Sequence, residues 1–368
     1  MPADGSVGVV RSIGDISVLR WRNELEHHQV NLFGAVLAAT LLVTAAPPVL
    51  AAEDAVTVNV DNYARAETDM QIGRMLKMAG GVNKLIHNRE PTPLDKQLVI
   101  RMNRDTLYSF AIVDISKGAT VTMPDAGERY MSVMVVNNDG YINKVYHGGG
   151  TYDLTIEEFD TPYVVLAVRT LVNASDDADV KAANTLQDKM KIEAASAKPF
   201  VMPNYDMESY KATYNPLLEL SKGIPDTRKT FGKKGDVDPV RFLLGSAFGW
   251  GGLPIEEAYY LNVQPNLPIG EYQVTVKDVP VDAFWSISVY NKDGYFQKND
   301  LNAYSVNNIS GKPNKDGSLT VHFGGCEDKR VNCLPLTEGW NYAVRLYQPR
   351  EEILDGEWTF PAPQPVKQ

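Results

Sequence analysis

One stretch of the chain gathers side chains that could do chemistry: HNREPTPLDKQLVIRMNRDTLYS, which begins at His87. It supplies an imidazole, guanidinium groups, an amide, a carboxylate and a phenol, carried by His87, Arg89, Arg101, Asn103, Asp105 and Tyr108. Arg101, Asn103 and Asp105 alternate, so on an extended strand they would share one face. Such a row can orient a polar ligand, and Asp105 with His87 or Arg101 can perform acid–base work. The same groups can equally form a buried network that joins a helix to a sheet.

The last third of the chain offers further groups for a ligand. Trp285 begins the strand-like stretch WSISVY, and such a ring either stacks on a flat ligand or packs in a core. Arg345, in NYAVRLY, alternates with apolar neighbours and can pair with a carboxylate of ligand or protein. The predicted catalytic residues are therefore Asp105 and His87. The predicted ligand-binding residues are Arg89, Arg101, Asn103, Tyr108, Trp285 and Arg345.

The motifs of several enzyme classes are missing from the sequence. It contains no serine-hydrolase elbow, phosphate-binding loop, dinucleotide fingerprint or metalloprotease motif. Beyond residue 51 the histidines are His87, His147 and His322, and their spacing does not support a metal site. We therefore predict no metal, and the sequence identifies no cofactor.

The beginning of the chain is typical of an exported protein. An apolar run from Leu32 to Val43 is followed by small residues, with Val49 and Ala51 at the positions that a signal peptidase prefers. Residues 1–51 are thus predicted to be a signal peptide with an atypically long, mixed-charge leader. The rival interpretation is an uncleaved anchor, although the run is short for a membrane span. Cleavage would leave a periplasmic or secreted protein without a stable membrane span.

The net charge bears on partners, and the cysteines bear on disulfide formation. The formal net charge of -10 argues against nucleic acid as a partner. The two cysteines, Cys326 and Cys333, are close in sequence, and in an oxidising compartment such a pair usually forms a disulfide.

A repeated stretch indicates internal duplication. MSVMVVNNDGYINK begins at Met131 and WSISVYNKDGYFQK begins at Trp285. Asp-Gly between alternating apolar residues predicts a β-hairpin. The identities beyond the turn, such as Ser132 with Ser286, suggest two β domains built on one plan.

The rest of the chain fits this interpretation. Short strand patterns fill both ends, and the middle is alanine-rich and helical in composition. The prediction is a mainly β protein with a helical linker block and two jelly-roll-like antiparallel β-sandwich domains. The predicted segments are 52–175 (an N-terminal β domain with a leading helix), 176–260 (the helical linker) and 261–368 (a C-terminal β domain).

Four motifs resemble one bacterial family of exported proteins: NYARAETD, HNREPTPLDKQLVIRMNRDTLYS, AFWSISVYNKDGYF and GWNYAVRLYQPREEILDGEWTFP. Its two domains are known only as domains of unknown function 1254 (N-terminal) and 1214 (C-terminal). The resemblance runs from about Asn62 to Pro361. It implies two β-rich domains and a periplasmic or secreted location, and it implies no reaction.

Two functions remain open from the sequence. The first is an exported protein that holds a polar small molecule or glycan in a groove between two β domains. The second is a periplasmic hydrolase that uses Asp105 with His87 or Arg101. A homo-oligomer also remains open.

Overall fold

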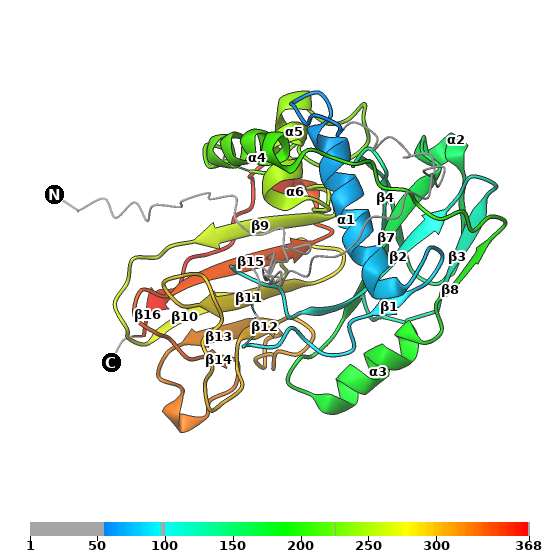
Figure 1. Cartoon of the computed structure of the whole chain (residues 1–368). Helices are drawn as coiled ribbons and strands as arrows, with labels where there is room; N and C mark the ends of the chain where they lie inside the picture. Colours follow the sequence, from blue (N-terminus) through cyan, green and yellow to red (C-terminus); the bar gives the residue numbers. More distant parts are fainter. Residues whose placement is uncertain (1–54, 96, 98–99, 225, 367–368) are drawn as a thin grey trace, which may run out of the picture.

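The computed structural model describes residues 55–95, 97, 100–224 and 226–366 (Figure 1). The predicted signal peptide, residues 1–51, lies outside these residues. Among the residues described, no helix is long and apolar enough to cross a membrane.

The first half of the chain forms two antiparallel sheets. The larger sheet has the order β1 (Ile86–His87), β2 (Thr106–Asp114), β7 (Tyr163–Leu171), β4 (Met131–Asn137) and β5 (Ile142–His147). The smaller sheet has the order β6 (Gly150–Leu154), β3 (Ala119–Met123) and β8 (Lys191–Ala194). Every second residue of a strand points to the same face, so Val113, Val133 and Leu166 pack against Val121 of the smaller sheet.

The second half also forms two sheets. One has the order β12 (Ser305–Asn307), β11 (Trp285–Tyr290), β15 (Asn341–Tyr347) and β9 (Ala258–Val263). The other has the order β14 (Cys333–Leu334), β13 (Leu319–Phe323), β10 (Tyr272–Val276) and β16 (Gln364–Pro365), in which β13 and β14 run parallel. Ile287 and Val344 of the first pack against Val274 and Val321 of the second.

Helices cover the first half and link it to the second. They are α1 (Tyr63–Ala79), α2 (Ile156–Phe159), α3 (Asp177–Gln187), α4 (Met207–Ser221), α5 (Pro239–Gly249) and α6 (Glu351–Leu354), with one 3-10 turn, η1 (Cys326–Asp328). The side chains of Asp176, Asp206 and Asp238 accept hydrogen bonds from the first backbone amides of α3, α4 and α5, which explains where these helices begin. Ile72 and Met75 of α1 pack on the face of the larger first sheet that the smaller sheet leaves open, and α1 crosses that sheet in Figure 1.

The predicted mainly β class with a helical block is confirmed, and so is the shared plan of the two halves. The order β2-β7-β4-β5 matches β9-β15-β11-β12, and β6-β3-β8 matches β13-β10-β16. Matching strands also follow one another in the same order along the chain. The jelly-roll arrangement of the strands stays a prediction.

The repeated stretch forms the same turn in both halves. Asn137 accepts backbone hydrogen bonds from Asp139 and Tyr141, and Asn291 does so from Asp293 and Tyr295. The first turn connects β4 to β5 as a hairpin. The second does not close a tight hairpin as expected, because residues 291–304 lie between β11 and β12.

Strand pairing moves both ends of the predicted linker. The alanine-rich segment that was expected to be helical contains β8, which pairs with β3 and extends the first half beyond residue 175. At the other end β9 begins at Ala258, three residues before the predicted start of the second domain. These strands are too short to give a clear strand pattern within a segment of helical composition.

Candidate functional site

The loop of residues 100–105 carries three of the predicted site residues to the second half of the chain. The backbone amide of Arg101 donates to the Gly294 carbonyl (2.5 Å), and its Nε donates to Oδ1 of Asn341 (3.3 Å). Asn103 Nδ2 donates to the hydroxyl of Tyr347 (2.9 Å). These residues therefore contact the large sheet of the second half, but not as parts of a strand. The alternation expected at Arg101 was wrong, because Arg101 has a φ of 53° and β2 begins only at Thr106.

Asp105 ends this loop in the contact between the two halves. Its side chain accepts a hydrogen bond from the Ser286 hydroxyl to Oδ2 (2.6 Å), and its residue is only 1% exposed. The second oxygen, Oδ1, is buried and has no hydrogen-bond partner among the residues described. A buried acceptor of this kind is costly unless a donor reaches it.

Arg345 is buried in the same contact. Nη1 donates to Ser288 Oγ (3.0 Å), and Nη2 donates to the Tyr290 hydroxyl and to the Arg101 carbonyl (both 2.8 Å). The predicted role in binding a ligand carboxylate stays a prediction. The contacts show that Arg345 joins β11 and the 100–105 loop.

A second buried arginine, Arg169 on β7, was not predicted. The residue is 2% exposed, and its guanidinium carbon lies 5.5 Å from the ring centre of Tyr108. Nη2 reaches the Gly251 carbonyl at 3.5 Å, and Nη1 has no partner among the described residues. Arg169 also forms no ion pair with any residue that the structure describes.

Four tyrosines from both halves interact electrostatically with Arg169, and we call this group the arginine chamber: Arg169 with Tyr108, Tyr130, Tyr260 and Tyr347. The rings of Tyr130 and Tyr347 lie 5.4 Å apart, and those of Tyr260 and Tyr347 lie 6.4 Å apart. Burial raises the pKa of Tyr130, Tyr260 and Tyr347 above that of free tyrosine. Their hydroxyls are therefore neutral at physiological pH and cannot balance the charge of the guanidinium.

A hydrogen bond between the two halves lies beside the chamber. His147 Nε2 is 2.7 Å from Oε2 of Glu257, and both side chains are partly exposed. The imidazole ring of His147 lies 5.8 Å from the ring of Tyr130. The pair thus places a carboxylate and an imidazole next to the tyrosine hydroxyls.

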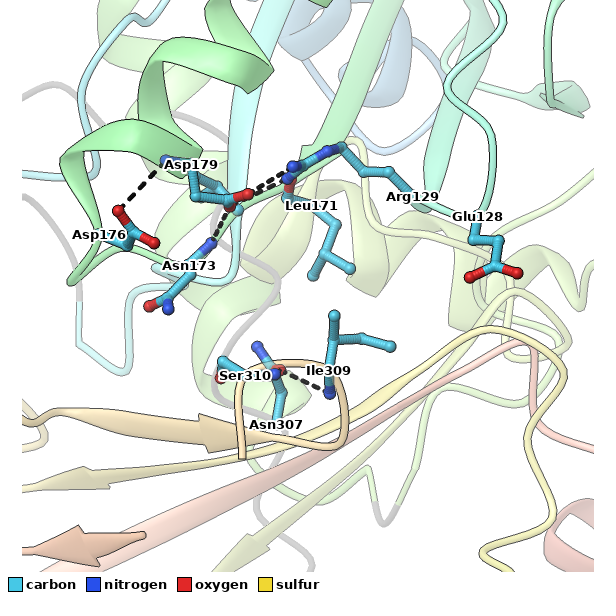
Figure 2. A pocket seen from close by; sticks show the side chains of 10 residues that line it. Glu128, Arg129, Leu171, Asn173, Asp176, Asp179, Asn307, Ile309 and Ser310 are labelled. Atoms are coloured by element: carbon cyan, nitrogen blue, oxygen red, sulfur yellow. Dashed lines mark hydrogen bonds and ion pairs between the residues drawn. The ribbon is translucent and has the colours of Figure 1, made fainter. Parts of the chain in front are cut away.

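A cavity of about 350 Å³ lies at the junction of the two halves, and we call it the seam pocket. Its walls include Leu171, Val172, Asp176 and Asp179 of the first half and Asn307 and Ile309 of the second. Figure 2 shows Asp179 paired with Arg129 on one wall, with Asn307 and Ile309 across from them.

Neighbours of both unpaired groups line the seam pocket, although Asp105 and Arg169 themselves do not. The Val172 amide donates to the Asp105 carbonyl (2.8 Å), and Asn307 lies directly opposite Ser286 in the sheet. Leu171 lies two residues beyond Arg169 on the same face of β7, about 7 Å along the strand.

The structure does not bring His87 and Arg89 into this contact region. His87 Nδ1 lies 2.8 Å from Ser109 Oγ, and Ser109 points away from the face that carries Tyr108. Arg89 donates to the Asn184 carbonyl and pairs with Asp188, both at the end of α3. Burial, and then the charge of Arg89, lower the pKa of His87.

The remaining predicted residues have structural contacts. Trp285 packs inside the second half, 5.5 Å from the ring of Phe360, on the face opposite to Ser286. Cys326 and Cys333 form the predicted disulfide, with an S–S distance of 2.04 Å. Within the described ranges, no group of three or more His, Cys, Asp or Glu side chains could hold a metal ion.

A signal in the sequence could have revealed Arg169. The tripeptide AVR occurs at residues 167–169 and again at 343–345, at matching positions of the two halves. The apolar composition of YVVLAVRTL is typical of an ordinary buried strand, and this obscures the first copy.

Comparison with known proteins gives matches to two family models and a similar fold. Residues 82–153 match the family described as "Protein of unknown function (DUF1254)", and residues 264–351 match "Protein of unknown function (DUF1214)". No curated protein matches the chain.

Two solved structures are similar to it. The VPA0106 protein from Vibrio parahaemolyticus aligns with a TM-score of 0.62 and 22% identity, over 84% of this chain and 100% of that one. An uncharacterized protein from Burkholderia cenocepacia aligns with a TM-score of 0.45 and 15% identity, over 79% of this chain and 84% of that one. The likeness to the Vibrio protein shows a common fold. The chain therefore carries a segment similar to DUF1254 followed by a segment similar to DUF1214, two domains of unknown function.

Proposed function

We propose that the protein binds a polar small molecule or short glycan in the contact between its two β halves. The observation that carries this proposal is Oδ1 of Asp105, a buried carboxylate oxygen without a donor among the described residues. Leaving such an acceptor unpaired costs about 1–3 kcal/mol, or more for a charged group. A ligand that donates a hydroxyl or amide proton to Oδ1 would offset that cost.

The size of the seam pocket supports a small ligand. Its volume of about 350 Å³ is at the lower end of the range for small-molecule sites. Both halves line it, and the amide of Val172 in its wall donates to the backbone carbonyl of Asp105. This suits a single compact molecule better than a polymer.

The test is a thermal-shift screen of polar metabolites and short sugars, followed by calorimetric titration of those that stabilise the protein. Asp105→Asn keeps an oxygen that can accept from Ser286 but removes the free carboxylate oxygen. We expect this variant to fold and to bind at least about tenfold more weakly. The control is Asp282→Asn, which changes an exposed acid of the second half. Equal affinity in Asp105→Asn and the wild type would reject the site.

The alternative is a periplasmic hydrolase in which the free oxygen of Asp105 acts as a general base. Its partner would be Arg101 of the same loop rather than His87, whose Nδ1 contacts Ser109. A hydrolase should lose kcat in Asp105→Asn while its affinity for substrate changes little. A binding protein should show no turnover with any ligand from the screen.

We further propose that the protein is exported to the periplasm or secreted. The apolar run Leu32–Val43 supports this, and so does the disulfide, because disulfides persist in oxidising compartments. Mass spectrometry of the protein from its native host should find a mature N-terminus near Ala52. A cytosolic product that begins at Met1 would contradict export. The absence of nucleic acid as a partner and the homo-oligomer stay predictions.

A further inference from the structure

The two halves repeat a group of three residues across three neighbouring strands. Arg169 lies between its cross-strand neighbours on β2 and β4, and Arg345 lies between the matching neighbours on β9 and β11. The first group is Tyr108, Arg169 and Ser132, and the second is Tyr260, Arg345 and Ser286. The same three residue types in the same register show that the two arginines are structurally equivalent.

The equivalent arginines differ in their partners. Ser288 and Tyr290 of β11 accept hydrogen bonds from Arg345. The matching positions of β4 hold Met134 and Val136, which offer no acceptor side chain. At these two positions β4 therefore offers Arg169 none of the side-chain acceptors that β11 offers Arg345, although both guanidinium groups are buried.

This difference leaves an uncompensated charge. A guanidinium cannot lose its proton at physiological pH, so burial cannot be relieved by neutralisation. A buried charge without a counter-ion is strongly unfavourable, and an anion close to it removes most of the penalty. Among the residues described no carboxylate pairs with Arg169, so a ligand is the natural source of the anion.

We propose that Arg169 binds the carboxylate of a small monoanionic organic ligand. This proposal rests on the proposed function and names the chemical class of its ligand. Arg169 would hold the carboxylate through Nη1 and Nη2, and neutral tyrosine hydroxyls of the chamber would donate to the same group. One buried cation balances one negative charge, and Glu257 adds negative charge close to Tyr130. A dianion such as phosphate would therefore remain partly uncompensated.

The surroundings of Arg169 indicate the body and the approach of the ligand. Phe284 stacks on Tyr347 at 4.1 Å, and Tyr108 stacks on Phe110 at 5.9 Å, so the walls suit a flat or compact body. Tyr108 and Tyr260 lie between the halves yet retain accessible surface.

The experiment measures melting temperature and calorimetric affinity with four probes at matched ionic strength: sodium benzoate, sodium glucuronate, sodium phosphate and sodium chloride. In the wild type we expect a carboxylate probe to raise the melting temperature by roughly 2–4 °C at a hundredfold excess over its Kd. Benzoate and glucuronate distinguish an aromatic from a sugar-like body. Phosphate and chloride should have no comparable effect.

Two variants of Arg169 and one matched control complete the design. Arg169→Met should fold with a melting temperature equal to or above that of the wild type, because it removes an uncompensated charge, and it should lose the response to carboxylate. Arg169→Lys keeps the charge without the bidentate geometry, so its affinity should fall about tenfold. The control Arg345→Met removes the equivalent arginine that the protein itself pairs, and its melting temperature should fall by roughly 5 °C.

Several results would overturn the proposal. One is a carboxylate response that Arg169→Met retains, and another is an equal response to phosphate or chloride. A third is stabilisation only by neutral polar ligands in both the wild type and Arg169→Met, which would preserve the proposed function but remove this inference. If no probe and no screened metabolite binds, both proposals fail.

Discussion

Arg65 and Asp139 form an ion pair of 2.6 Å that joins helix α1 to the turn after β4. Behind it Asp69 accepts a hydrogen bond from Asn138 of the same turn (2.5 Å) and another from the Tyr205 hydroxyl (2.7 Å). The two contacts differ in burial: the side chain of Asp139 is 44% exposed, whereas that of Asp69 is 1% exposed. The motif NYARAETD and the first NNDGY turn thus form one structural unit.

Because Asp69 is buried and Asp139 is not, replacing the two acids should lower the stability by different amounts. Asp139→Ala should lower the free energy of unfolding by less than about 1 kcal/mol, since exposed ion pairs contribute little. Asp69→Ala should lower it by about 3–5 kcal/mol, because it leaves buried donors of Asn138 and Tyr205 unpaired. Urea denaturation of both variants measures the difference. Equal losses would show that the exposed pair, and not the buried network, holds the turn.

The two repeated glycines should resist substitution. Gly140 and Gly294 have φ values of 91° and 84°, and an added Cβ would lie 2.9 Å from Thr68 Oγ1 in the first turn and 3.0 Å from Ile100 Cβ in the second. We expect each alanine variant to lose about 2–4 kcal/mol of stability. Gly118→Ala is the control, because its φ is 80° but nothing lies within 4 Å of the added carbon. It should lose only about 1–2 kcal/mol. A loss as large in Gly118→Ala would mean that backbone strain accounts for the whole effect.

The lowered pKa of His87 should make the stability of the folded protein depend on pH. Its pKa is lowered in the folded protein, mainly by burial and then by Arg89, so the unfolded chain binds more protons below about pH 6.5. The contribution of neutral His87 is therefore complete above that pH and is lost as the pH falls toward the folded pKa. His87→Asn, which can still bond Ser109, should flatten the stability profile between about pH 5 and 7 relative to the wild type. Unchanged slopes would contradict the assignment, and denaturation at several pH values measures them.

The disulfide should contribute to stability through the unfolded chain. Cys326 and Cys333 are separated by seven residues, and closing so small a loop is worth about 2–3 kcal/mol in the chain-entropy account. A Cys326→Ala, Cys333→Ala double variant should melt earlier by a corresponding amount. Thiol counting on the denatured, unreduced wild type should find no free thiol. Two titratable thiols would show that the bridge does not form in the cell.

The sequence predicted the shared plan because its signals are local. Asp-Gly turns and apolar alternation depend on residues near one another. The 100–105 loop could not be predicted in this way. Its left-handed residue, Arg101, is held by the carbonyl of Gly294, almost two hundred positions later in the chain.

Closeness in sequence does not decide which of the predicted site residues lie between the two halves. His87 and Arg89 are near Asp105 in sequence, yet Ser109 of β2 forms the hydrogen bond with His87, and the end of α3 accepts those of Arg89. Asp105 and Asn103 do contact the second half, but Arg169 joins them only through strand pairing. Distances between strands are fixed by the fold and leave no trace in spacing along the chain.

The loop that carries Arg101 and Met102 also decides how the chain can be divided. Arg345 of the second half donates hydrogen bonds to the backbone carbonyls of both residues, which belong to the first half. The region around them is apolar as well, since Leu94 and Met102 pack against Tyr290, Phe296 and Tyr304. A fragment that begins at β9 would lack these two acceptors of the Arg345 guanidinium and would expose the patch that the loop covers. The two domains recognised by sequence thus form one structural unit, because residues of the first half complete the packing and hydrogen bonding of the second.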